Sequence, residues 1–453
     1  MGRPNKKHPR KRIDSEDSMK AKGRTYRATL KSGVSRRTFI AASAGAIAMP
    51  AVLRYSRAFA AEPAIKVGLV TPRTGPLAGF AEADDYILGE LKPLFDGGVE
   101  NNGKKVRIEI VAKDGQSTST RAAEVATQLI KEDEVDLLLG QATPDTTNPV
   151  ADQAEANEVP CITTNCPWQP YFFGRNGDPA VGFDWTYHFF WGLEDVIAAF
   201  LALWEGTDTN KQVGGLFPND ADGNAWGDPE RGLPPAFKAA GYSLLDPGRY
   251  QVLNDNFTSQ IQAFKSASCE IVTGNMIPPD FVTFWGQAAQ LGFRPKIVTI
   301  GKALLFPQVP ESMGDRADGL STEIWWTPNH PYKSSITGQS ARELTDGYVN
   351  ATKRPWTQPI GYQHALFEVM VDVIKRTEDI DDNKAILDAI AKTDLNTIVG
   401  PIKWTGQPVK NVSKTPLVAG QWQKTASGAF DLVICENKTA PEIPVGGALK
   451  LLS

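Results

Sequence analysis

The stretch from Val135 to Trp168 constrains the fold most, because it contains two strands and the helix between them. Val135–Leu139 is a short apolar run with a β-branched start, which is typical of a strand buried on both faces of a parallel sheet. We expect Thr146 or Thr147 to cap the following helix, with Pro149 in its first turn.

The second strand of this stretch is Cys161–Thr163, so the segment forms one βαβ unit. In an open parallel sheet, ligands bind at the carboxyl ends of the strands, where helix N-termini offer free N–H groups. The loops Gln141–Thr147 and Thr164–Trp168 lie at such ends. We therefore predict that both loops belong to a binding site.

The rest of the chain continues the alternation of strands and helices, which predicts doubly wound α/β domains. Further strands are expected at Ile65–Val70, Val106–Ala112, Val213–Phe217, Glu270–Thr273 and Ile297–Ile300. Helices are expected at Ala81–Leu94, Ser119–Lys131, Val196–Leu203, Pro234–Ala240, Phe257–Ser268 and Phe281–Leu291, with two more in 338–377 and short antiparallel strands in 398–435. The length after residue 60 is that of two domains, each able to bury its own core.

The first 60 residues have the composition of an export signal. The sequence Ser35-Arg36-Arg37-Thr38-Phe39-Ile40 precedes a short apolar run, and Ala58-Phe59-Ala60 provides small residues for cleavage. This order resembles the twin-arginine signal that exports folded proteins in bacteria, which predicts a periplasmic location. A basic tail before a cytosolic domain is the alternative, and Met19 is an alternative start.

Charge and cysteine content restrict the partners. Of 48 basic and 52 acidic residues, 15 and 3 lie in residues 1–60, which leaves 33 and 49 and a formal charge of −16. The chain after residue 60 is therefore acidic and has no electrostatic basis for binding nucleic acid or anionic membranes.

Four cysteines do not make a disulfide framework. Cys161 is expected as a core thiol, with a Cys161–Cys166 bond as the alternative. No residue spacing suggests a metal site, and no cofactor is predicted.

Several motifs together resemble the solute-binding proteins of the branched-chain amino acid type, which serve ATP-driven (ABC) importers. The motifs, which span most of the chain after residue 60, are Thr74–Ala78, Asp114 with Arg121–Glu124, Gly140–Pro160, Gly361-Tyr362 and Asn396–Trp404. The resemblance implies two Rossmann-like α/β lobes joined by three hinge crossings, with a ligand held between the lobes. It further implies a monomer that is not an enzyme and that delivers its ligand to a membrane permease.

The resemblance also implies where the lobes divide. We expect crossings near Asp178–Trp185, Ile324–Pro328 and Asn396–Lys403. The first lobe would comprise 64–184 plus 327–396, and the second 185–326 plus 397–453. Lobes hinged in this way close around a ligand.

Positions that match the family's ligand contacts form the predicted site. They are Phe80, Thr143, Asp145, Thr146, Asn165, Pro167, Trp168, Trp226, Met276 and Lys302. Two departures stand out. Asp145 lies where relatives hold a carboxylate through serines, so it would repel a carboxylate or hold a cationic or hydroxylated ligand. Lys302 or Ala303 lies where relatives have an acidic residue for the amino group.

These departures bear on the class of ligand. Lys302 and Arg73 could bind an anion, and Phe80, Trp168 and Trp226 could enclose a flat apolar body. They favour a ligand other than an amino acid, such as an aromatic or aliphatic carboxylate or an amide, while an amino acid stays open. Each residue also has a structural alternative: the tryptophans in the core, Lys302 on the surface, and Asp145 as a helix cap.

A secreted enzyme and a periplasmic sensor are the two alternatives to a transport function. A secreted enzyme is disfavoured, because the sequence has no G-x-S-x-G, G-x-x-x-x-G-K-[ST] or G-x-G-x-x-G motif. A periplasmic sensor that docks on a membrane receptor would use the same closure, so the sequence leaves that alternative open.

Overall fold

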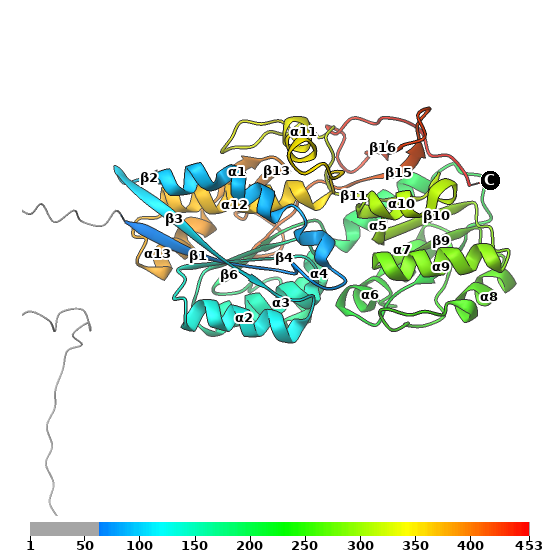
Figure 1. Ribbon diagram of the computed structural model, residues 1–453. Helices are drawn as coiled ribbons and strands as arrows, with labels where there is room; N and C mark the ends of the chain where they lie inside the picture. The colour runs from blue at the N-terminus through cyan, green and yellow to red at the C-terminus, as the bar shows by residue number, and fades with distance from the viewer. Residues whose placement is uncertain (1–62, 453) are drawn as a thin grey trace, which may run out of the picture. The chain divides into compact units, whose positions relative to one another are not determined.

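The computed structural model describes residues 63–452, whose strands form two seven-stranded sheets and a small hairpin (Figure 1). The expected export signal therefore lies outside the described residues. Among residues 63–452, no helix has the length and apolar character needed to cross a membrane.

The first of two large sheets has seven strands in the order β14-β6-β5-β4-β1-β3-β2. Its strands are β1 (Ala64–Thr71), β2 (Val99–Asn101), β3 (Lys104–Asp114), β4 (Leu137–Gln141), β5 (Cys161–Thr164), β6 (Thr186–Phe189) and β14 (Val412–Ser413). All pairings are parallel except that of β2 with β3. Every residue of β4 is buried, so the apolar run is a doubly covered strand, as predicted, although it begins two residues later.

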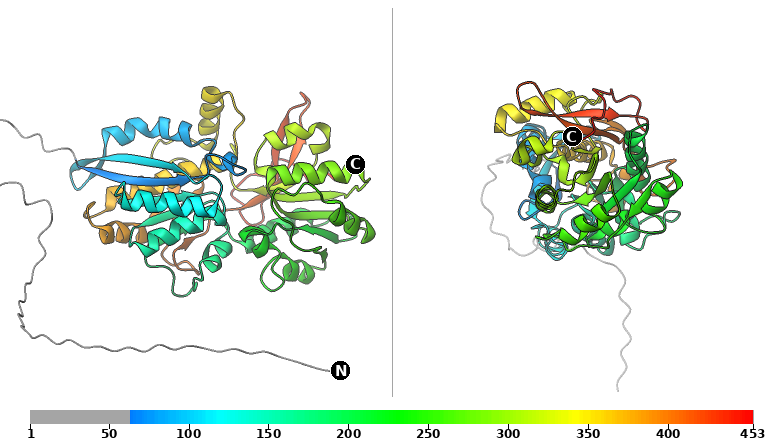
Figure 2. Two further views of the ribbon diagram at one scale, coloured as in Figure 1. Left: turned by 60° about the horizontal axis from the view of Figure 1, so that its bottom comes forward. Right: turned by 90° about the vertical axis from the view of Figure 1, so that its right-hand side faces the viewer.

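Helices cover both faces of this sheet. They are α1 (Asp84–Gly97), α2 (Ser119–Lys131), α3 (Pro144–Ala156), α4 (Trp168–Gly174), α11 (Ala341–Thr352), α12 (Pro359–Arg376) and α13 (Asn383–Ala391). Helices α2 and α3 pack together on one face, and α1 and α12 lie on the other (Figure 1, Figure 2). Right-handed crossovers require this split, because the chain moves from β1 to β3 in one direction and from β3 to β4 in the other.

The second sheet also has seven strands, in the order β16-β15-β11-β10-β9-β7-β8. Its strands are β7 (Gln212–Leu216), β8 (Ser243–Leu245), β9 (Ile271–Met276), β10 (Ile297–Lys302), β11 (Ser321–Ile324), β15 (Val418–Lys424) and β16 (Phe430–Glu436). Its helices are α5 (Leu193–Trp204), α6 (Ala221–Trp226), α7 (Leu233–Ala239), α8 (Thr258–Ser266), α9 (Pro278–Gln290) and α10 (Gln308–Met313). Short 3-10 turns lie at Ala78–Ala81, Ala303–Leu305 and Gly314–Ala317, and β12 (Asp394–Thr397) pairs with β13 (Gly400–Lys403) in a separate hairpin. The two sheets confirm the predicted α/β fold of two doubly wound lobes.

The start of α3 differs from the prediction. Thr143 is the N-cap in an extended conformation, and Thr146 completes the capping box, so a cap at Thr146 or Thr147 is wrong. Pro149 lies inside the helix rather than in its first turn. Its missing N–H leaves the carbonyl of Asp145 free, and the Ser119 hydroxyl donates to that oxygen at 2.6 Å.

Sheet membership moves the proposed division between the lobes. Strand β6 pairs with β5, so the chain leaves the first sheet after Phe189 and not near Asp178–Trp185. Strand β14 pairs with β6, so the third crossing follows Ser413 rather than lying at Asn396–Lys403. Strand β14 has only two residues and no pattern, whereas the Thr and aromatic residues of β6 are typical of a strand that the prediction overlooked.

Candidate functional site

The carboxyl ends of strands from both sheets meet at a narrow cavity. We call it the central cavity, and it is lined by Phe80, Ala142, Thr143, Asn165, Pro167, Trp191, Asp222, Trp226, Asn275, Lys302, Glu323 and Trp325. In both sheets it lies beside the point where the strand order reverses, which is where open α/β sheets bind ligands. Six of the ten predicted site residues line it: Phe80, Thr143, Asn165, Pro167, Trp226 and Lys302.

On the side of the first lobe, the cavity wall is polar and uncharged. Asn165 follows β5 with a positive φ of 68°, a conformation that asparagine tolerates well. Its Nδ2 donates to Gln141 Oε1 at 2.7 Å, while its Oδ1 is buried without a hydrogen-bond partner. Because a buried acceptor without a partner is costly, this oxygen is a candidate ligand contact.

On the side of the second lobe, the wall is charged. Lys302 ends β10 at φ 66° and ψ −56°, a γ-turn conformation that is rare and strained in ordinary residues. Its Nζ lies 2.7 Å from Asp222 Oδ2 and 3.4 Å from Asp220 Oδ2. Burial acts to lower the Lys302 pKa, but the two carboxylates outweigh burial and raise it. The ammonium is therefore already paired, and the prediction that it is free to bind an anion is not supported.

Further carboxylates surround this lysine. Glu323 on β11 accepts hydrogen bonds from the Lys302 N–H at 2.9 Å and the Thr322 hydroxyl at 3.0 Å. Burial raises the pKa of Glu323 to about 7 and that of Asp222 to about 6, despite the attraction of Lys302 for Asp222.

One carboxylate connects the lobes. Asp145 does not line the cavity, but its Oδ2 accepts the backbone N–H of Ala221 in α6 at 3.3 Å. Burial raises its pKa, and repulsion from Asp220 adds to this effect. With α3 and α4 packed on α6, the lobes are in contact around the cavity.

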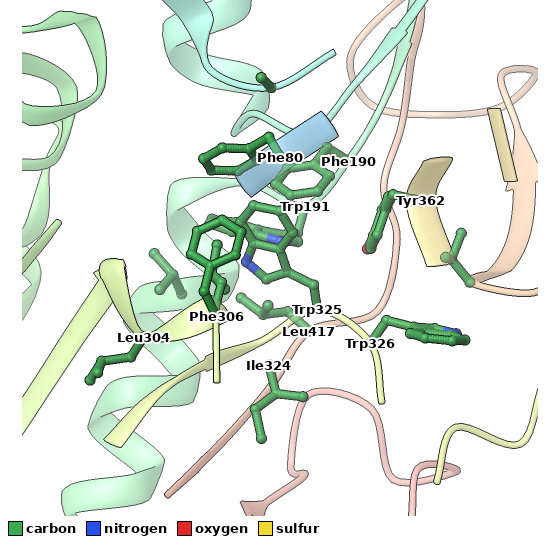
Figure 3. Close-up of a cluster of buried hydrophobic side chains, with 14 of the residues drawn as sticks. Phe80, Phe190, Trp191, Leu304, Phe306, Ile324, Trp325, Trp326, Tyr362 and Leu417 are labelled. Carbon is green, nitrogen blue, oxygen red and sulfur yellow. The ribbon is translucent and has the colours of Figure 1, made fainter. Parts of the chain in front are cut away.

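Aromatic rings form the remaining walls. Phe80 lies edge-on to Phe306, with ring centroids 5.2 Å apart, and 6.1 Å from Trp325, while Trp191 lies 6.0 Å from Trp325 (Figure 3). Trp226 lies against β10, where a Cβ at Gly301 would come within 2.8 Å of its ring. The glycine is therefore needed for this close approach.

The other four predicted residues lie near the cavity but do not line it. Thr146 is buried in the cap of α3, and Asp145 bridges the lobes as described. Trp168 begins α4 and donates from Nε1 to Glu194 Oε1 at 3.1 Å. Met276 is fully buried in the core, whereas its neighbour Asn275 faces the cavity, because successive strand residues point to opposite faces.

Arg73 was also predicted as a possible anion site, and the structure places it elsewhere. Its guanidinium pairs with Asp85 near the surface, and its backbone N–H donates to Asp114 Oδ1 at 2.9 Å. It does not line the central cavity.

The cysteines in the described part of the chain are unpaired, with Cys161 and Cys166 both buried, so the expected core thiol is confirmed and the alternative bond is not present.

Five lining residues were not among the predicted contacts: Ala142, Trp191, Asp222, Glu323 and Trp325. Asn275 belongs to the segment Asn275–Ile277 that the resemblance aligns with ligand contacts, from which Met276 was predicted. Glu323 had a signal in the sequence, since it is an acidic residue within the short run Ser321–Trp326 that is otherwise apolar or hydroxylic. Asp222 had none, because the six-residue helix that holds it has no recognisable pattern.

Two α/β lobes that enclose a cavity at their strand ends define a two-lobed binding protein. The chain belongs to the periplasmic binding protein family, whose family model matches residues 64–427.

Solved structures have the same fold. A solute-binding protein of an ABC transporter from Rhodopseudomonas palustris BisB5, in complex with 3,4-dihydroxybenzoic acid, is 20% identical, with a TM-score of 0.68 over 84% of this chain and 99% of that one. A leucine-binding protein from Thermotoga maritima is 19% identical, with a TM-score of 0.64 over 83% of this chain and 99% of that one. A branched-chain amino acid transporter substrate-binding protein from Streptococcus pneumoniae, in complex with isoleucine, is 15% identical, with a TM-score of 0.64 over 82% and 99%.

Proposed function

We propose that this protein captures a small organic solute in the central cavity and delivers it to the membrane permease of an ABC importer. The observation that carries the proposal is the set of buried polar atoms without partners that face one cavity. They are Asn165 Oδ1, Trp191 Nε1, Asp222 Oδ1, Trp325 Nε1 and both amide atoms of Asn275. Since buried polar groups are nearly always satisfied, a solute with donors and acceptors would complete them.

The arrangement of the lobes supports a cycle of binding rather than of chemistry. The hydrogen bond from the Ala221 N–H to Asp145 joins α6 of one lobe to α3 of the other, so separation of the lobes would break it. Opening would expose the cavity, and a bound solute would favour closure through its contacts with both walls. The relatives with this fold are binding proteins of ABC transporters, which agrees with a role in transport and not in catalysis.

Delivery to a permease requires export, for which the twin-arginine pattern at Ser35–Ile40 is the proposed signal. The protein would then act in the periplasm as a monomer.

A ligand screen with residues 61–453 tests this function. The panel holds amino acids, amides, aromatic acids and organic cations, and the midpoint of thermal unfolding is measured. A ligand present at about 100 times its dissociation constant adds about 2.7 kcal/mol of stability. A shift with at least one compound that is lost in Asn275→Ala supports the function and the cavity. Absence of any shift, together with no small molecule detected by native mass spectrometry of the freshly purified protein, contradicts it.

A further inference from the structure

The balance of charge around the central cavity bears on the class of solute, given the proposed function. Within the described residues, one ammonium, that of Lys302, lines the cavity and is paired with two carboxylates. The acidic groups on the surrounding elements are Asp145 on α3, Asp220 and Asp222 at α6, Asp280 on α9 and Glu323 on β11. Acidic groups therefore outnumber basic groups around the cavity before any ligand binds.

One of these carboxylates, that of Asp222, lines the cavity and has an oxygen without a hydrogen-bond partner. Asp222 is buried, and its Oδ2 contacts Lys302 at 2.7 Å, while its Oδ1 has no partner. A buried carboxylate oxygen without a donor is among the costliest polar groups to leave unsatisfied. A positively charged donor in the cavity would satisfy it and offset the surplus of acid.

The start of α3 lacks the free N–H groups that a carboxylate ligand would use there. At the start of α3, Pro144 has no N–H, and the N–H groups of Thr146 and Thr147 are both directed to the Thr143 carbonyl. Asp145 adds a negative charge at the same helix N-terminus. An anionic group placed there would meet a carboxylate instead of free donors.

The aromatic walls favour a cation. Phe80, Trp191 and Trp325 lie close together (Figure 3), and with Trp226 they line the cavity, so both lobes contribute aromatic rings. The faces of aromatic rings attract cations, and the attraction is strongest for tryptophan and for ammonium groups that are weakly hydrated. Aromatic rings beside acidic groups suit an alkylated ammonium group, while the unpaired Nε1–H groups of Trp191 and Trp325 suit an oxygen of the same solute.

We propose that the solute is a small organic cation without a carboxylate, held by the aromatic walls and Asp222, with a hydroxyl or carbonyl group for Asn165 and Asn275. This class differs from the carboxylate that the sequence favoured through Lys302. The change follows from the pairing of Lys302 with Asp220 and Asp222.

A set of matched compounds tests the charge directly by isothermal titration calorimetry on residues 61–453. Choline is compared with 3,3-dimethylbutan-1-ol, which replaces its nitrogen by carbon, and with glycine betaine, which adds a carboxylate. Ethanolamine, leucine and benzoate complete the panel. We expect choline or ethanolamine to bind at least tenfold more tightly than the neutral alcohol, betaine, leucine and benzoate.

Two further measurements separate charge from shape. Asp222→Asn should weaken binding of the cation at least tenfold and change binding of the neutral alcohol less than threefold. If Asp222→Asn does not fold, Asp145→Asn is measured in its place. A bound cation lowers the pKa of the carboxylates around it, so binding near pH 6.5 should release protons, seen as a dependence of the heat on buffer ionisation. Binding of an anion would instead take protons up.

The possible results distinguish a failure of the cation proposal from a failure of the proposed solute-binding function. Tighter binding of leucine, benzoate or the neutral alcohol, or uptake of protons, overturns the cation and leaves the solute-binding function intact. No binding by any compound of this panel or of the wider screen contradicts both.

Discussion

The two walls of the central cavity are built from equivalent parts of similar sheets, yet they differ in charge. The first lobe presents Thr143, Asn165 and Pro167, all uncharged, whereas the second presents Asp222, Lys302 and Glu323. Strand ends thus fix where a ligand binds, while the residues placed there decide what is bound. The contrast implies that stability and affinity respond differently to changes in each wall.

The largest expected effect comes from removing the lysine of the charged wall. Lys302→Met leaves Asp220 and Asp222 buried without their cation, so we expect the free energy of unfolding to fall by about 3–5 kcal/mol in urea denaturation. The exposed pair of Lys92 with Asp96 provides the control, because Lys92→Met should cost less than about 1 kcal/mol. Equal effects of the two substitutions would show that the charged wall contributes nothing special to stability.

The next prediction concerns pH. Burial raises the pKa of Glu323 from 4.5 to about 7, so the folded state binds the extra proton and stability falls as pH rises from about 4.5 to 7. Removing the ionisable group in Glu323→Gln should make this fall smaller by up to about 3 kcal/mol between pH 4.5 and 8.

Glu368 in α12 has the same raised pKa of about 7, also from burial, but does not line the cavity. Glu368→Gln should therefore reduce the pH dependence of stability in the same direction and leave ligand affinity unchanged. A pH profile of Glu323→Gln that matches that of the unsubstituted protein would contradict the proposed burial of a charge on β11.

A smaller effect is expected in the uncharged wall. Asn165→Ala removes an unpaired acceptor that faces the cavity, and the loss of one neutral hydrogen bond should weaken ligand binding about fivefold by calorimetry. This is less than the effect expected for Asp222→Asn. The reverse order would mean that the first lobe, and not the second, dominates recognition.

The smallest effect is expected at Arg73, because its guanidinium pairs with Asp85 away from the cavity. Arg73→Gln should change ligand affinity by less than about twofold. A tenfold loss would return an anionic ligand to consideration.

The fold was largely predictable from the sequence, because long elements have clear patterns. The apolar run at Val135–Leu139 and the amphipathic helix Ser119–Lys131 both became the elements expected. The short strands β6 and β14 were not predicted, and they shifted two of the three crossings.

The site was only partly predictable. Asn165 lies in a loop where the topology of parallel sheets predicted the site, whereas Lys302 followed from the resemblance to the family. The pairing of Lys302 with Asp220 and Asp222 joins residues about 80 positions apart, which no local pattern encodes. The sequence therefore indicated the strand ends that line the cavity but not the carboxylates that pair with its lysine.

Hydrogen–deuterium exchange in the presence of choline would show whether the two lobes close around a solute, because one backbone amide reports closure. The N–H of Ala221 donates across the cleft to Asp145, so exchange in the segment 219–227 depends on whether the lobes are in contact. We predict that saturating choline slows exchange in the segment 219–227 and at the start of α3, with no change in the distant α13. Unchanged exchange at 219–227 under conditions in which choline binds would contradict closure around a solute in the central cavity.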